Sequence, residues 1–453
     1  MIPAHIGRVV AVLCAIVVIT LVAAGASARV HVLTRGKLIR FENQGVAAEN
    51  GGRVIVGRDR VLRTLYDPTC PATSSVDVEA YLQSTLRDAT LAHVELDCAK
   101  WSAHGGGFTY ADPTGTVRSI QYLHSALQME IRGAGFTPIG GPVGYVQAQL
   151  RIGDETLRAR FHNFRRNDAA AVVSRVPSTA GAFGEAAFWD LMYGDMHSEA
   201  SQQFALGALE KAVHGNPRDG RSHFLLAMLH LYRFGQRVTR IEDADAAARA
   251  EIAAANAAFA TAVPLLWDDA TATGGSRVPG FAAAAKYLLG AVEQDDGLRA
   301  EGLADLARSV AVNSFFNVFD YIPVMQVLPP SDPAFQQAYA SFVAYLNDPE
   351  ILRCVSSQPE LCANAGFAPR NIQGALTLFG DVYVKGGDLA AAQRWYDLVN
   401  LFPETASWKF AAVIADRVAN AASRVALYAD ADPSNDPPLI GAGPEACAVC
   451  HNR

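Results

Sequence analysis

The sequence has few charged residues for its length, and several enzyme signatures are missing. Charged side chains make up 18% of the 453 residues and half of the residues are apolar, so a disordered chain is excluded. There is no H-E-x-x-H of zinc peptidases, no G-x-S-x-G of serine hydrolases and no G-x-x-x-x-G-K-[ST] of nucleotide-binding loops. The sequence therefore favours a carrier or binding protein over an independent enzyme.

Positive charge is scarce in the larger part of the chain. Residues 29–180 carry 18 Lys and Arg against 14 Asp and Glu, whereas residues 181–453 carry 19 against 31. This asymmetry indicates two domains with different surfaces. The acidic excess argues against nucleic acid as a partner, because phosphate binding needs positive charge.

The first 28 residues have the pattern of an export signal. Arg8 precedes an apolar stretch over 9–24, and Ala26-Ser27-Ala28 fits a cleavage site. An uncleaved anchor, giving membrane association through the N-terminus, is the alternative, because the stretch is long for a signal core. The basic residues that follow from Arg29 favour cleavage. We expect residues from 29 onward to be exported to a bacterial periplasm or cell envelope.

Cysteine is also scarce, and its distribution fits an oxidising compartment. Cys14 lies in the signal segment and leaves six cysteines in the exported chain. Pairing of near neighbours gives two candidate disulfides, Cys70 with Cys98 and Cys354 with Cys362. Cys447 and Cys450 are then left over.

Residues 29–180 have the alternation of β-strands. Apolar and polar residues alternate over 146–152 and again over 157–162, with Gly153-Asp154 between them, which predicts a hairpin. Its polar face carries Arg158, Arg160 and His162, and we expect that face to be wet. The segment ALQMEIR, 126–132, predicts another strand. A β-sandwich is the expected fold of this part.

Residues 181–429 have helical periodicity and an internal repeat. The clearest unit, 371–403, resembles a tetratricopeptide (TPR) repeat at Leu376, Phe379, Gly380, Tyr383, Gly387, Ala392, Tyr396 and Val399. A second unit covers 204–235. The resemblance implies stacked helix pairs with a concave face that holds a peptide or a protein partner. The whole chain is thus predicted to be a multidomain α+β protein.

Residues 430–446 are rich in proline and aspartate. Four prolines and no helical periodicity predict a linker, which could span roughly 50 Å when extended. We therefore expect the tail, 447–453, to be tethered to the helices.

The tail contains Cys447-Ala448-Val449-Cys450-His451. This run resembles the haem-attachment motif of c-type cytochromes, in which two cysteines bind the haem vinyl groups and the adjacent histidine is the proximal iron ligand. The resemblance implies one covalent haem c on Cys447 and Cys450, with His451 on the iron. It implies an exported monohaem electron carrier that receives a redox partner on its helical scaffold.

Other interpretations of the motif remain open. Cys447 and Cys450 could form a plain disulfide in an envelope adaptor that binds another protein through its helices and holds no haem. A thioredoxin-like redox pair lacks its βαβ context, and a zinc site lacks a second pair of ligands. A haem sensor or peroxidase would need an open position on the iron. The sequence distinguishes no distal ligand.

Overall fold

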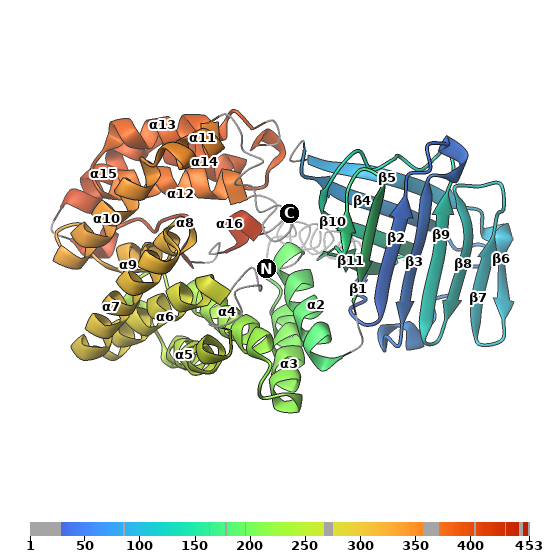
Figure 1. Ribbon diagram of the computed structural model, residues 1–453, viewed down its shortest axis with the longest axis horizontal. Coiled ribbons are helices and arrows are strands. Elements are labelled where there is room, and N and C mark those ends of the chain that lie inside the picture. The colour runs from blue at the N-terminus through green and yellow to red at the C-terminus, as the bar shows by residue number, and fades with distance from the viewer. Residues whose placement is uncertain are drawn as a thin grey trace, which may run out of the picture.

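The computed structural model describes residues 29–84, 87–162, 164–176, 179–194, 196–266, 275–356, 371–402, 405–430, 432–443 and 447–451. The described chain is mixed α+β, as predicted, with strands in its N-terminal part and helices in the remainder (Figure 1). The expected signal segment 1–28 and Cys362 lie outside the described residues, and so does the expected pairing of Cys354 with Cys362.

The strands of the described chain form two sheets. One has the order β1 (Arg29–Val32), β11 (Glu155–Phe161), β10 (Val143–Ile152), β4 (Ser74–Leu82) and β5 (Arg87–Leu96). The other has the order β12 (Arg166–Asn167), β13 (Ala171–Arg175), β2 (Lys37–Glu42), β3 (Gly51–Gly57), β9 (Ala126–Arg132), β8 (Val117–Leu123), β7 (Gly107–Ala111) and β6 (Trp101–His104). β1 pairs with β11 in parallel, and the neighbours in the rest of both sheets are antiparallel.

Apolar residues of both sheets share one core. Met129 of β9 and Leu150 of β10 are both buried in it, because alternation along each strand turns every second side chain inward. The predicted hairpin is confirmed: β10 and β11 are antiparallel, with Leu150 opposite Leu157. The strand predicted at 126–132 is β9.

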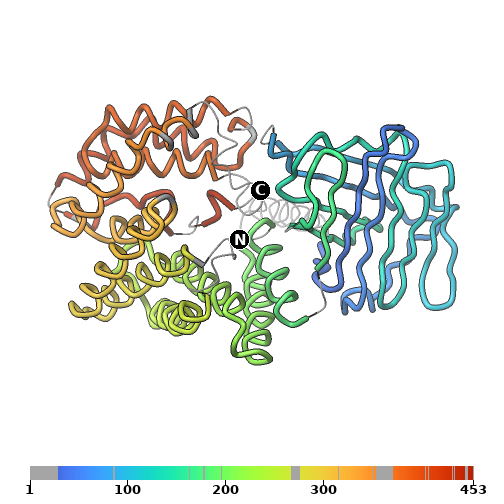
Figure 2. Tube along the Cα trace, in the orientation of Figure 1, coloured from blue at the N-terminus to red at the C-terminus, as the bar shows by residue number. Residues whose placement is uncertain are grey.

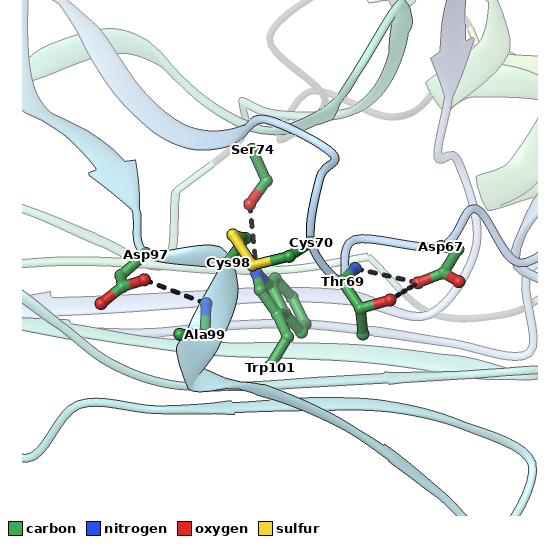
Figure 3. Close-up of a disulfide and its surroundings, with 8 residues drawn as sticks. All are labelled: Asp67, Thr69, Cys70, Ser74, Asp97, Cys98, Ala99 and Trp101. Carbon is green, nitrogen blue, oxygen red and sulfur yellow. Dashed lines mark hydrogen bonds between the residues drawn. A yellow bond between two sulfur atoms is a disulfide. The ribbon is translucent and has the colours of Figure 1, made fainter.

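A disulfide joins Cys70 to Cys98, beside the start of β4 (Figure 3). Their Cα atoms are 5.0 Å apart. Next to the bridge, the indole Nε1 of Trp101 donates to Ser74 Oγ at 3.1 Å. The bridge ties the segment before β4 to the turn after β5, and by closing a loop between residues 28 apart it lowers the entropy of the unfolded chain.

The helices of the described chain follow from residue 180. They are α2 (Ala180–Tyr193), α3 (Glu199–Gly215), α4 (Gly220–Arg237), α5 (Ala246–Leu266), α6 (Val278–Glu293), α7 (Asp296–Val312), α8 (Ser314–Asn317), α9 (Ile322–Val327), α10 (Pro333–Leu346), α11 (Pro349–Ser356), α12 (Asn371–Lys385), α13 (Leu389–Val399), α14 (Ala411–Ala419), α15 (Ala421–Ala429) and α16 (Ala448–His451). Several begin at a side chain that accepts a hydrogen bond from the first turn, including Asp219 before α4, Asp295 before α7 and Asp388 before α13.

Consecutive helices pack in pairs, and the pairs follow an arc (Figures 1 and 2). Helices α2, α4, α6 and α12 lie on the inner side of the arc, and α3, α5, α7 and α13 lie outside them. The short helix α16 at the C-terminus lies inside the arc, where it packs on α12 and α2. The two ends of the helical arc are thereby joined by the last turn of the chain.

Helix α2 also covers the polar face of the β10–β11 hairpin, so the prediction that this face is wet is wrong at two residues. Arg160 is 1% exposed and His162 is 4% exposed. The guanidinium of Arg160 donates to Gln147 Oε1 at 2.7 Å and lies 5.3 Å from the ring of Tyr193 on α2. Alternation along a strand cannot reveal that a later helix covers its polar face.

Charge is buried at this junction between the sheets and α2. Lys37 Nζ donates to the carbonyl oxygen of Arg160 at 2.6 Å and lies 3.7 Å from Asp190 Oδ2. Burial, with the nearby positive charges of Lys37 and Arg160, holds the pKa of His162 well below its usual range. His162 is therefore neutral in the folded protein at neutral pH.

The buried imidazole predicts acid sensitivity. Below pH 6.5 the unfolded chain binds a proton at His162 that the folded chain does not, so the folded state loses up to about 1.4 kcal/mol for each pH unit. His162→Phe, which keeps a ring in place, should flatten the fall in unfolding free energy between pH 7 and pH 5, measured with urea.

The control is His93→Gln. The pKa of His93 is raised by its hydrogen bond to Asp77, so this exposed histidine stabilises the folded state at low pH, with the opposite sign. Its removal should leave the acid sensitivity in place. Equal slopes in the native chain and in His162→Phe would contradict the assignment.

Candidate functional site

The cysteine and histidine side chains of the C-terminal motif lie on one turn of backbone. The carbonyl oxygen of Cys447 accepts hydrogen bonds from the backbone N–H groups of Cys450, at 3.2 Å, and His451, at 3.1 Å. Residues three and four apart lie on one face of a helix, so the two sulfurs and the imidazole belong to one short helical unit. The sulfurs of Cys447 and Cys450 are free and are not bonded to each other.

This turn packs into the helical core. Ala448 and Val449 are buried, and Cys450 faces Gly374 of α12. A Cβ atom at Gly374 would lie 2.5 Å from Cys450 Sγ, so only glycine permits this approach. Burial raises the pKa of Cys447 to about 11 and that of Cys450 to about 12, so both thiols carry their protons at neutral pH.

The imidazole of His451 lies against Trp189 of α2. The centroids of the two rings are 6.2 Å apart and their planes are inclined by 36°. Trp189 is 8% exposed and stacks on Tyr193 at 5.7 Å. The ring of His162, which directly follows β11, meets the indole edge-on at 6.0 Å. The motif is thus in contact with the first helix of the arc, which in turn covers the sheet.

The segment before the motif is packed, so the prediction of a tether over 430–446 is wrong for the residues that the structure describes. We call residues 432–443 and 447–451 the C-terminal strap. Leu439 and Ile440 are buried in the helical core. The backbone N–H of Leu439 donates to Gln326 Oε1 at 2.8 Å, and that of Ile440 donates to Asp381 Oδ2 at 2.7 Å. The burial of two large aliphatic side chains, worth about 1.5–3 kcal/mol each, adds to these hydrogen bonds in holding the segment on the helices.

Further side chains of the arc hold carbonyl groups of the strap. Arg240, just after α4, donates to Ser434 at 2.6 Å, Tyr428 of α15 to Pro437 at 2.5 Å, and Arg417 of α14 to Pro438 at 3.2 Å. Because these donors come from both ends of the arc, the strap crosses its inner side.

Asp381 of α12 is the centre of this attachment. Its carboxylate is fully buried and accepts from the hydroxyl of Tyr396 at 2.6 Å, from Arg424 at 2.9 Å and from Arg417, besides the N–H of Ile440. Burial alone would raise the pKa of Asp381, but the two guanidinium groups more than offset it, and the pKa lies below its usual value. The carboxylate stays ionised and holds all four donors.

The sequence predicted Cys447, Cys450 and His451 as the functional group, and the structure places Cys450 and His451 on α16 and Cys447 immediately before it. It adds Gly374, Trp189 and the neighbours of Asp381, which sequence reasoning missed. Gly374, in a helix otherwise rich in large residues, was a usable signal for a close contact. Trp189 and Asp381 had none, because their partners are far away in sequence.

Among the residues that the structure describes, no group of three or more His, Cys, Asp and Glu side chains is placed to hold a metal ion. Among the described helices, none is long and apolar enough to cross a membrane. Comparisons with protein-family models, curated proteins and solved structures find no match for the chain.

The close contact at Gly374 can be tested by adding one methyl group. Gly374→Ala should cost about 1–3 kcal/mol of unfolding free energy, because the methyl group overlaps Cys450 Sγ. It should also speed alkylation of the Cys447 and Cys450 thiols, measured by mass spectrometry, as α16 leaves α12.

The matched control is Gly207→Ala in α3, where nothing lies within 4 Å of the added methyl group. This change should stabilise the chain by about 0.5–1 kcal/mol, since alanine favours the helix. If Gly374→Ala changed stability and thiol alkylation no more than Gly207→Ala does, the close packing of α16 on α12 would be contradicted.

The attachment of the strap can be tested at Asp381. Asp381→Asn leaves Arg417 and Arg424 without their counter-charge and should cost about 3–5 kcal/mol. Thermal unfolding gives this loss, and proteolysis of the strap in the folded protein should become faster. Asp397→Asn, an exposed aspartate that accepts from Gln393, should change stability by less than about 0.5 kcal/mol. Equal protection of the strap in both variants would contradict this role of Asp381.

Proposed function

We propose that the protein is an exported monohaem c-type cytochrome that transfers one electron at a time. Cys447 and Cys450 would form the two thioethers, and His451 would be the proximal ligand of the iron. The observation that carries the proposal is the set of donors on one turn: two sulfurs that are not bonded to each other, followed at once by a partly buried imidazole.

The surroundings of the motif support a haem rather than a hydrophilic ion. Ala448 and Val449 belong to the helical core, and Trp189 covers the imidazole. An apolar shell of this kind keeps water from a haem and raises its reduction potential. The bound haem would supply the one-electron chemistry, while the chain holds it, orients His451 and limits the access of water.

The helices are part of the same proposal as a TPR-like scaffold. Support comes from the unit 371–403, where a Cβ atom at Gly380 would lie 2.3 Å from Tyr396 Cε1. A small residue against a large one across a helix pair is the packing that the repeat requires. The redox partner would then meet the arc that surrounds the strap, and the N-terminal signal would deliver the chain to the bacterial periplasm or envelope.

Expression in a host with cytochrome-maturation machinery tests the proposal. The expected product is a red protein whose haem stays with the polypeptide after denaturation and whose spectrum changes on reduction. Cys447→Ala with Cys450→Ala should abolish the colour, and circular dichroism should still report the helices. As a control, Cys354→Ala should leave the haem in place.

A mature polypeptide whose mass contains no haem would overturn the proposal. Binding of carbon monoxide to the reduced protein would instead redirect it to a haem sensor or peroxidase with an open iron position.

A further inference from the structure

The indole of Trp189 lies at a meeting point of three parts of the molecule. It belongs to α2, the first helix of the arc. His451 of the strap lies against it at 6.2 Å, and His162 of the β-sheet part lies against it at 6.0 Å, with ring planes inclined by 66°. A single side chain is therefore in contact with both imidazoles.

The indole is held firmly in its own helix. Its ring stacks on Tyr193 at 5.7 Å and meets the ring of Phe188 edge-on at 5.0 Å. Its Nε1 donates to Glu185 Oε1 at 3.4 Å, and this carboxylate also accepts from Arg221 at 3.0 Å. These contacts fix the orientation of the indole, so that it can serve as a platform on which another ring packs.

On the side of the sheets, His162 is buried and neutral, and its Nδ1 has no hydrogen-bond partner in the described part of the chain. Its visible contribution is therefore contact with the rings of Trp189 and Tyr193. The unmade hydrogen bond at Nδ1 costs free energy, and the edge-on contacts with Trp189 and Tyr193 are the packing that holds this imidazole and the two rings together.

We infer that Trp189 is a positioning residue for His451, and that the β-sheet part of the chain acts on this imidazole through His162. The inference rests on the proposed function for its effect on the haem, but the contact between the rings exists without one. The structure thus gives the N-terminal part a role in setting the reduction potential: it fixes the platform on which the proximal ligand lies.

The experiment compares four variants of the full chain: Trp189→Leu, Trp189→Phe, His162→Ala and His162→Phe. In the haem-loaded protein, Trp189→Leu should lower the reduction potential, because water reaches the imidazole and stabilises the oxidised iron. Trp189→Phe should restore most of the native value. His162→Ala should lower the potential by a smaller amount, and His162→Phe should reverse that change.

A second readout needs no haem. In the haem-free chain with labelled histidine, the indole shifts the NMR signal of the His451 Cε1–H group by its ring current. Trp189→Leu should remove this shift, and His162→Ala should alter it. His451→Gln assigns the signal.

Trp395→Leu is the matched control. Trp395 of α13 is 5% exposed and packs on Phe379, so the variant loses the same atoms from the same helical core. It should lower stability and leave both the potential and the His451 signal unchanged. Equal effects of Trp189→Leu and Trp395→Leu on these readouts would overturn the inference.

The outcomes for the inference and for the proposed function are separate. If the protein is colourless but Trp189→Leu still shifts the His451 signal, the proposed haem attachment is refuted and the positioning role of Trp189 is supported. If the protein is red but Trp189→Leu changes neither the reduction potential nor the His451 signal, haem attachment is supported and the positioning role is refuted. If His162→Ala changed neither readout, the contribution of the β-sheet part would be refuted.

Discussion

A carboxylate that has lost all contact with water governs the C-terminal half of this protein. Removing the charge of Asp381 from water is costly, and the cost is met only if every donor around it is in place. Those donors come from α13, α14, α15 and the strap. A slip of the strap by one residue would take the N–H of Ile440 away from Asp381 and that of Leu439 away from Gln326. The charge therefore specifies one register for a segment that has little regular secondary structure.

This register decides where the motif lies. Ile440 is anchored at Asp381, and Gly374, two turns before Asp381 on the same face of α12, leaves room for Cys450. The motif is consequently an internal part of the helical arc. For the proposed cytochrome, the haem would be held at a fixed place inside a scaffold, and an electron would reach it through a partner bound there rather than through a swinging tail.

The mixed α+β character of the chain could be predicted because periods of two and of 3.6 residues are local properties of the sequence. The hairpin of β10 and β11 and the grouping of Cys447, Cys450 and His451 followed from such local patterns. The wet face at Arg160 and the tether over 430–446 failed for a common reason. In each case a distant element, α2 or the inner side of the arc, covers residues whose own neighbours in sequence show no sign of it.

The contact between Trp189 and His451 joins the first helix of the arc to the last turn of the chain, and it orders events during synthesis. The ribosome releases residue 189 long before residue 451. The part of α2 that contacts His451 therefore stays exposed while the other helices form. The contact between Trp189 and His451 joins residues that are far apart in the sequence, so forming it costs the entropy of closing a long loop. It is therefore a late step of folding. Before this contact forms, the parts of α2 and α12 that pack on α16 are exposed to solvent, and the chain is more open to proteases than the finished molecule.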